Sequence, residues 1–282
     1  MPTSTRFTDL VGCELPVQLA AMGGAGTTDL AAAVVAAGGF GMVPRGREPA
    51  AGACGANFLL PFKPPLDEVS AAAGRSRVVE FFYEDPRADL VRLVHDAGAL
   101  VGWQVGSAAE AEAAAECGCD YVVAQGTEAG GHVRGTEPLA ELLPAVQSAV
   151  RVPVVAAGGV ATAERFAELM ELGADAVRVG TRFVVCPESG AHPEYVRQLL
   201  AAGGDDTVLT EWYGEGWESA PHRVLRSAFD AAQRSGWRQP TPPYAEVDRD
   251  PGDMAMYAGT GVGHVTAEEP AAAVVADLVS LL

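Results

Sequence analysis

The segment Val152-Pro-Val-Val-Ala-Ala-Gly-Gly159 decides the fold class of this chain. Its first six residues are apolar without interruption, which is typical of a parallel strand buried on both faces, whereas a half-exposed antiparallel strand would alternate apolar and polar residues. The two glycines then end the apolar run, as turn residues do. The segment therefore predicts a strand in a parallel sheet whose two faces are both covered.

Similar apolar runs recur along the chain, each bounded by Gly, Pro or charged residues. They give eight strand candidates, at 16–21, 39–43, 54–59, 77–83, 99–104, 120–125, 153–157 and 176–180. Stretches of helical length rich in Ala, Leu and Glu lie between most of them, at 27–37, 65–74, 86–96, 107–117, 136–149 and 162–172. The stretch around 44–53 is too short and too rich in Gly and Pro for a helix. Strand and helix alternate, and eight such units fit a closed (β/α)8 TIM barrel, an α/β fold, better than an open doubly wound sheet.

Capping residues support this order of elements. Thr27, Ser107 and Thr162 each stand at the head of a predicted helix, where a hydroxyl group can accept a hydrogen bond from a free backbone N–H. Gly38 and Gly173 stand at the ends of two predicted helices, where glycine is a common terminator. The local signals therefore agree with the apolar pattern.

The regular alternation of predicted strands and helices ends after residue 186. Pro, Trp and Gly become frequent, through Glu211-Trp-Tyr-Gly-Glu-Gly-Trp217 and again through Gln239-Pro-Thr-Pro-Pro243. We therefore expect a small, partly helical insert or lid at 191–253, a C-terminal excursion that packs near the barrel mouth. The barrel itself is assigned to 1–190 and 254–282, with a last helix at 269–281.

The charge of the chain excludes some partners. Nineteen basic residues against 37 acidic ones give a formal net charge of −18, which repels phosphate backbones and anionic lipid, so we expect no nucleic acid and no membrane partner. No window reaches 18 uncharged apolar residues, and the first ten residues lack a secretory apolar core, which favours a cytoplasmic protein. The five cysteines suggest no disulfide framework, and Cys117-Gly-Cys119 lacks the CxxC spacing, so no metal site is expected.

Candidate functional residues follow the predicted strands, because the carboxyl ends of parallel barrel strands converge on one mouth. Glycines there let a phosphate approach the backbone, and a following helix supplies free N–H groups and a positive dipole end. Glycines after both the seventh and the eighth strand therefore predict a phosphate-bearing ligand. In chain order the candidates are Ala21 and Met22, then Asn57, Gln104 and Gln125, then Gly158 and Gly159, and finally Gly180 and Thr181.

The most distinctive segment is Gln125-Gly-Thr-Glu-Ala-Gly-Gly-His132-Val-Arg-Gly135, at the exit of the sixth strand. A loop so rich in glycine can lie flat against a ring. His132 would then project over the ligand and could accept or donate a proton at cellular pH. The other histidines carry weaker signals: His95, His192 and His222 are interpreted as surface or capping residues, and His264 ends a glycine-rich loop, 259–264, that could also reach the mouth.

These segments resemble the nitronate monooxygenase family, formerly called 2-nitropropane dioxygenases, which are FMN-dependent barrels. The resemblance covers about residues 14–186 and 254–282, and its most specific part is the string Glu128-Ala-Gly-Gly-His132. Two residues depart from the usual family pattern: Ala21 replaces Pro, and Thr260 replaces Gln. The weaker matching strings are 16–22, 30–34, 37–41, 55–59, 154–159, 179–183 and 257–261.

The resemblance implies FMN as the cofactor and His132 as the active-site acid/base. It places Met22, Asn57 and Gln125 at the flavin, and it places Ala129, Gly130 and Gly131 along the ribityl–flavin region. Gly158, Gly159, Gly180 and Thr181 would hold the phosphate. The expected cofactor-binding set is completed by Ala21, Gln104, Gly259 and Thr260.

The implied activity is oxidation of nitronates or nitroalkanes with O2 to a carbonyl compound and nitrite. Three alternatives use the same barrel: an NAD(P)H-dependent flavin enoyl-ACP reductase, a specialised nitro-metabolite enzyme, and a non-catalytic flavin-binding protein. The partners are then a small-molecule substrate and O2, with a homodimer as a possible assembly. The residue pattern leaves the physiological substrate open.

Overall fold

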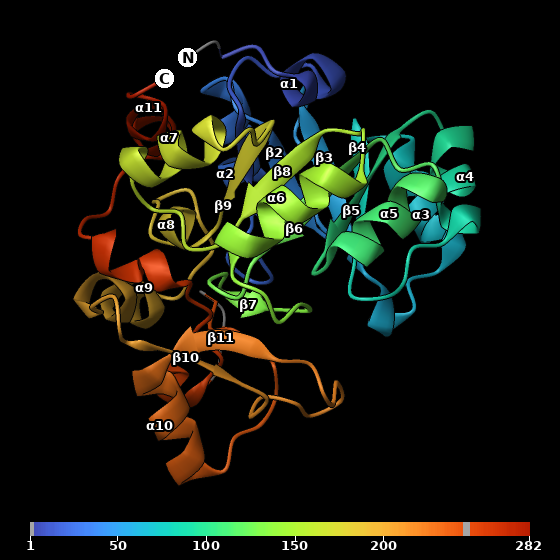
Figure 1. The fold of residues 1–282 in the computed structure, drawn as a ribbon. Helices are drawn as coiled ribbons and strands as arrows, with labels where there is room; N and C mark the ends of the chain where they lie inside the picture. The colour runs from blue at the N-terminus through green and yellow to red at the C-terminus, as the bar shows by residue number, and fades with distance from the viewer. Residues whose placement is uncertain (1–2, 245–248) are drawn as a thin grey trace.

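An eight-stranded parallel barrel forms the body of the molecule in the computed structural model, which describes residues 3–244 and 249–282. The strands pair in the order β1-β9-β8-β6-β5-β4-β3-β2, and a parallel bridge from Gln18 to Phe40 joins β1 to the chain just before β2. The sheet therefore closes, and the predicted TIM barrel is confirmed (Figure 1). Its strands are β1 (Val17–Leu19), β2 (Gly41–Pro44), β3 (Cys54–Leu59), β4 (Val78–Phe82), β5 (Leu100–Val105), β6 (Tyr121–Gln125), β8 (Val154–Ala157) and β9 (Ala176–Val179).

Helices form the outer layer around the barrel. The hydroxyl groups of Thr27, Ser107 and Thr162 each accept a hydrogen bond from the backbone N–H three residues on, which confirms the predicted N-caps. The described stretch between β2 and β3 contains no helix, as its Gly and Pro content predicts. The outer helices are α2 (Thr28–Ala36), α3 (Leu66–Ala73), α4 (Ala88–Asp96), α5 (Ala108–Glu116), α6 (Leu139–Ala149), α7 (Ala163–Glu171) and α11 (Ala271–Leu278).

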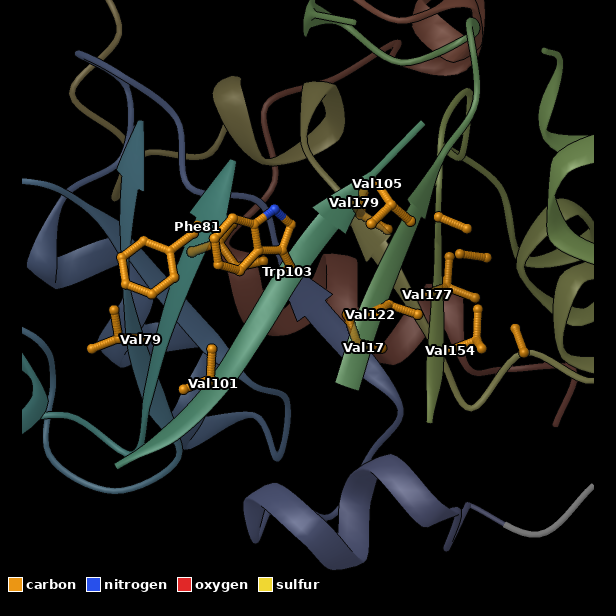
Figure 2. Packing of buried hydrophobic residues seen from close by; sticks show 14 of the residues in the cluster. Val17, Val79, Phe81, Val101, Trp103, Val105, Val122, Val154, Val177 and Val179 are labelled. Carbon is orange, nitrogen blue, oxygen red and sulfur yellow. The ribbon is translucent and has the colours of Figure 1, made fainter. Parts of the chain in front are cut away.

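Side chains along each strand alternate between the barrel interior and the surrounding helices. Val79, Phe81 and Trp103 belong to the larger apolar core between sheet and helices, together with many valines (Figure 2). Tyr121 belongs to a second cluster inside the barrel. Gly102 faces this interior, because a Cβ at Gly102 would overlap the Tyr121 ring. Both faces of the sheet are covered, as the uninterrupted apolar runs predict.

The amino end of the barrel is closed by the short helix α1 (Arg6–Val11), which the sequence pattern did not predict. Phe7 lies edge-on to the rings of Phe40 and Tyr121, with ring centroids 5.7 and 5.3 Å away. The Arg6 guanidinium donates to both carboxylate oxygens of Asp175, at 2.8 and 2.6 Å, which ties the helix to the chain before β9. With this end filled, a ligand has to enter from the carboxyl end.

The chain between β9 and α11 leaves the barrel. Its strand β11 pairs antiparallel with β10 and with the two-residue strand β7 (Gly131–His132), which lies in the loop after β6. Figure 1 shows this small sheet at the end of the barrel opposite α1, so the excursion near the mouth is confirmed. Residues 1–2 of the predicted barrel and 245–248 of the predicted insert lie outside the described residues. The excursion contains α8 (Thr181–Val184), α9 (Pro193–Ala201), β10 (Thr207–Thr210), β11 (His222–Leu225), α10 (Arg226–Ser235) and the 3-10 turns η2 (Pro251–Asp253) and η3 (Thr260–His264).

The five cysteines are free thiols. Cys117 ends α5, and Cys119 is buried just beyond it, which agrees with a helix-end and a core role for this pair. Burial raises the pKa of the Cys119 thiol. None of the helices within residues 3–244 and 249–282 combines the length and the apolarity needed to cross a membrane.

Candidate active site

A cavity of about 250 Å³ opens at the carboxyl ends of the barrel strands. The excursion supplies part of its wall through Tyr195, Trp217, Pro240 and Pro242. The structure brings all of the predicted site residues except Thr260 to this one cavity. They are His132, Ala21, Met22, Asn57, Gln104, Gln125, Ala129, Gly130, Gly131, Gly158, Gly159, Gly180, Thr181 and Gly259.

Main chain rather than side chains lines the cavity after β8 and β9. Gly158 and Gly159 have φ angles of +138° and +68°, a conformation that residues with a Cβ rarely adopt. A Cβ on Gly159 would also lie 2.8 Å from the Thr260 hydroxyl oxygen. Gly180 precedes the short helix α8 and also lines the cavity. Exposed backbone with little side-chain bulk suits the approach of a phosphate.

Glu128 fixes the glycine-rich loop after β6. Its carboxylate oxygens both accept the Leu139 N–H at the start of α6, at 3.1 and 3.0 Å. Its main-chain carbonyl accepts the Thr260 N–H at 3.0 Å, and a Cβ on Gly130 would lie 2.6 Å from the Gly259 nitrogen. The loops after β6 and at 259–264 therefore pack closely. Thr260 contributes to this packing and does not line the cavity.

His132 lies in β7, where the barrel loop meets the excursion. Its imidazole stacks on the Trp217 indole, with ring centroids 3.8 Å apart and planes 21° apart. His222, its neighbour in the antiparallel register, has its ring centroid 5.2 Å away. The Nε2 atom of His132 is buried and has no hydrogen-bond partner among the described residues. Burial, with a smaller effect of His222, lowers the pKa of His132 to about 3, so the imidazole is neutral at cellular pH.

A buried ion pair stands in the barrel interior at the cavity wall. Arg178 in β9 and Glu80 in β4 form it, with side chains 6% and 0% exposed, and Arg178 lines the cavity. Arg178 Nη1 donates to Gln104 Oε1 at 2.7 Å. Asn57 Nδ2 donates to Glu80 Oε1 at 2.9 Å. Charged side chains therefore hold two of the predicted cavity residues in place.

Sequence reasoning missed Arg178, Glu80 and Trp217. A signal for the ion pair was present, because each charged residue interrupts an otherwise apolar strand, in Val78-Val-Glu-Phe-Phe82 and Ala176-Val-Arg-Val179. Strand alternation directs both side chains into the barrel. Trp217 carried no comparable signal, because its contact with His132 joins segments that are distant in the chain.

The other four histidines differ from His132 and from one another in burial and in hydrogen-bond partners. The interpretation of His222 as a surface or capping residue is wrong: it is fully buried, because its strand is covered by the loop that carries His132. His192 does cap a helix, since its Nδ1 accepts the Glu194 N–H at 3.1 Å. His95 is a partly exposed residue of α4 beside Asp120. His264 is exposed and does not line the cavity, although Gly259 and Gly261 of the same loop do.

The polar atoms of the cavity fit a flavin nucleotide. Gln125 donates through Nε2 to the His132 carbonyl at 3.0 Å, and its buried Oε1 has no partner in the described chain. With His132 Nε2, this makes two unpartnered polar atoms, whereas buried polar groups in proteins are ordinarily paired. A ligand with hydrogen-bonding groups at the edge of an apolar ring system would give these two atoms hydrogen-bond partners. The glycines after β8 and β9 suit its phosphate.

A parallel barrel that is filled at its amino end and carries a glycine-lined cavity with a buried histidine at its carboxyl end defines an α/β-barrel enzyme. A family model described as nitronate monooxygenase matches residues 61–280. The chain therefore belongs to the nitronate monooxygenase family, whose members are oxidoreductases and generally depend on flavin. The resemblance inferred from the sequence strings is confirmed.

Individual relatives extend this comparison. A nitronate monooxygenase of Pseudomonas aeruginosa is 31% identical over 292 aligned positions, which cover 80% of this chain and 82% of the relative. A (3aS,4S,5R,7aS)-5-hydroxy-7a-methyl-1-oxo-octahydro-1H-indene-4-carboxyl-CoA dehydrogenase of Mycobacterium tuberculosis is 33% identical over 257 positions, covering 84% of this chain and 70% of the relative. The solved structure of FabK from Thermotoga maritima superposes with a TM-score of 0.83 at 29% identity, over 98% of this chain and 95% of FabK.

Proposed function

We propose that this chain is an FMN-dependent nitronate monooxygenase, which oxidises nitronates, or nitroalkanes after deprotonation, with O2 to a carbonyl compound and nitrite. The observation that carries the proposal is the buried, unpartnered Nε2 of His132. It stands in the wall of the same cavity as the glycines after β8 and β9. Membership of the nitronate monooxygenase family supports the choice of substrate class.

FMN would be held by groups that the cavity already presents. Its phosphate would be bound at the main chain of Gly158, Gly159, Gly180 and Thr181. The polar edge of its ring would be bound by the amides of Asn57, Gln104 and Gln125. When bound, FMN supplies the electron acceptor for the substrate, and O2 reoxidises it. The glycine loop 129–131 would leave room for the ring system and the ribityl chain.

His132 handles the proton in this proposal. A neutral imidazole has one free ring nitrogen, which can take the proton from the carbon beside a nitro group. The low pKa of His132 makes it a weak base, so neutral nitroalkanes are expected to react slowly. A nitronate arrives without that proton and needs only a hydrogen bond from the imidazole N–H. We therefore propose nitronates as the preferred form of the substrate.

The described part of the insert, 191–244 and 249–253, acts as a lid in this proposal. Trp217, Pro240 and Pro242 bring apolar surface to the cavity. Trp217 also stacks on His132. Excluding water in this way strengthens each hydrogen bond to the substrate and protects reactive species from side reactions.

The test compares wild type with His132→Gln on a nitroalkane and on its preformed nitronate. Loss of the base should slow nitrite release from the nitroalkane by about 100-fold or more, whereas the nitronate should lose much less. The absorbance of the bound flavin serves as the control for an intact site. Unchanged nitrite release from the nitroalkane would remove His132 from its assigned role.

A second candidate is an NAD(P)H-dependent flavin reductase or dehydrogenase that acts on an acyl thioester. The likeness to a carboxyl-CoA dehydrogenase favours it. Anaerobic mixing separates the two candidates: flavin bleaching by a nitronate supports the monooxygenase, and bleaching by NADH or NADPH alone supports the reductase.

A further inference from the structure

We propose that Arg178 and Glu80 are positioning residues for the flavin. Their ion pair fixes which amide atoms of Gln104 and Asn57 are free to meet the ligand, and it balances the charge at that part of the cavity wall. The inference rests on the proposed flavin site and extends it to the two charged residues behind that site.

Gln104 presents a hydrogen-bond donor to the cavity. An arginine guanidinium carries only hydrogen-bond donors, so the Gln104 atom that meets Arg178 Nη1 at 2.7 Å has to be the carbonyl Oε1. The Nε2 group of Gln104 is then left over, and no hydrogen bond occupies it within the described chain. Because Gln104 lines the cavity, this side chain offers a donor to the ligand.

Asn57 presents the opposite group, a hydrogen-bond acceptor. An ionised carboxylate only accepts, so the Asn57 atom that meets Glu80 Oε1 at 2.9 Å has to be Nδ2. Its Oδ1 is left over as a free acceptor at the cavity wall. One donor and one acceptor therefore stand at the same wall. Such a pattern is complementary to a carbonyl beside an N–H, as on the imide edge of a flavin.

Further hydrogen bonds hold the ion pair in one geometry. Arg178 also donates from Nε and Nη2 to Gln18 Oε1, at 3.1 and 3.0 Å. Tyr121 donates its hydroxyl to Glu80 Oε2 at 3.0 Å, and Gln18 Nε2 donates to the Tyr121 oxygen at 3.2 Å. Apolar residues of similar volume would fill the interior without the desolvation cost of two charges. A packing role alone therefore leaves the charges unexplained.

The arrangement also has an electrostatic consequence. Arg178 lines the cavity and Glu80 does not, although the pair as a whole is neutral. A flavin gains negative charge on reduction, and charges act strongly across a buried, low-dielectric wall. Removing one partner would leave the other uncompensated. The two single substitutions should therefore move the flavin midpoint potential in opposite directions.

The experiment uses Glu80→Gln, Arg178→Gln, the double variant and Arg178→Lys as purified holoproteins. The readouts are the midpoint potential of the bound flavin, measured against a reference dye, and the dissociation constant for FMN, measured by fluorescence quenching. We expect a higher potential in Glu80→Gln, a lower one in Arg178→Gln, and a value near that of wild type in the charge-conserving Arg178→Lys. The neutral double variant should keep the wild-type potential but bind FMN about tenfold more weakly. Its two introduced glutamines can both donate and accept, so they no longer hold the Gln104 and Asn57 amides in one orientation.

The outcomes separate this inference from the proposed function. Single variants that bind FMN but shift the potential in the same direction, or not at all, overturn the positioning role and leave the proposed function standing. A wild-type protein that binds no flavin overturns both. If the single variants do not fold, the double variant decides, and wild-type FMN affinity in that variant overturns the inference.

Discussion

The imidazole of His132 titrates under the influence of two neighbouring rings. Trp217 covers one face, and His222 lies beside it. Burial is the main cause of the lowered pKa, and His222 is the smaller one. The described residues place no carboxylate against Nε2, so nothing on the protein side stabilises an imidazolium there. Protonation of His132 is therefore expected to lower the free energy of unfolding.

This linkage predicts a specific pH dependence of stability. An unfolded histidine has a pKa near 6.5, whereas the pKa of folded His132 is about 3. Between these values the unfolded chain binds more protons, so the free energy of unfolding falls as the pH drops from about 7 towards 3. His132→Gln removes this contribution. In urea titrations at a series of pH values, wild type should lose more stability than the variant, and parallel profiles would contradict the assigned pKa.

The backbone conformation of Gly158 leads to a prediction about cofactor binding. Its φ of +138° strains any residue with a Cβ, and Gly98, at the end of α4, has a φ of +90° with open space around it. Gly158→Ala and Gly98→Ala should therefore both lower the free energy of unfolding, by about 1–3 kcal/mol. FMN affinity should fall in Gly158→Ala only, because Gly98 does not line the cavity. Equal FMN affinity in the two variants would show that the backbone at Gly158 does not bind the cofactor.

The pairing of β7 with β11 fixes the position of His132 at the cavity wall. The register sets Gly131 opposite Arg223 and His132 opposite His222. Arg223 also donates to the Thr127 carbonyl at 2.9 Å, which secures the start of the same loop. The loop between β10 and β11 then brings Trp217 onto the imidazole. The excursion therefore determines the surroundings of a residue that belongs to the barrel.

Trp217→Ala should raise the pKa of His132 towards its unperturbed value, because the variant readmits water to the imidazole. A histidine NMR titration measures this shift directly. Trp237→Ala is the matched control, since Trp237 belongs to the same excursion but stacks against Arg249, 3.6 Å from its ring centroid, and does not line the cavity. A His132 pKa that is equal in the two variants would show that Trp217 does not provide the desolvation.

The elements differ in how far the sequence determines them. The barrel strands were predictable, because strands such as Val154–Ala157 are buried on both faces and their apolar runs show it. The strands of the small sheet were not, because β7 has two residues and exists only through its pairing with β11. The site shows the same division. Glycines that directly follow an apolar strand can be recognised in the sequence, whereas the contact of His132 with Trp217 depends on long-range packing.

The cavity is lined by segments from most of the chain, from Ala20 near the first strand to Gly261 near the last helix. The barrel supplies the polar amides and the glycines after β6 and β8, whereas the excursion supplies Gly180, Gly259 and Gly261 together with the apolar cover. A ligand that fills the cavity therefore contacts both parts at once. Its binding free energy should stabilise the folded chain as a unit rather than one loop.

Comparing FMN with riboflavin tests how much the phosphate contributes to this stabilisation of the folded chain. Apoprotein mixed with ligand at 100 times the dissociation constant gains about 2.7 kcal/mol, enough to raise the unfolding midpoint by several degrees. Riboflavin has the same ring without the phosphate, so at equal concentration it should raise the midpoint much less than FMN. FAD tests whether the cavity accepts a larger nucleotide. Equal shifts with riboflavin and FMN would mean that the glycines after β8 and β9 do not hold a phosphate, whereas loss of the FMN advantage in Gly158→Ala would locate the phosphate at that turn.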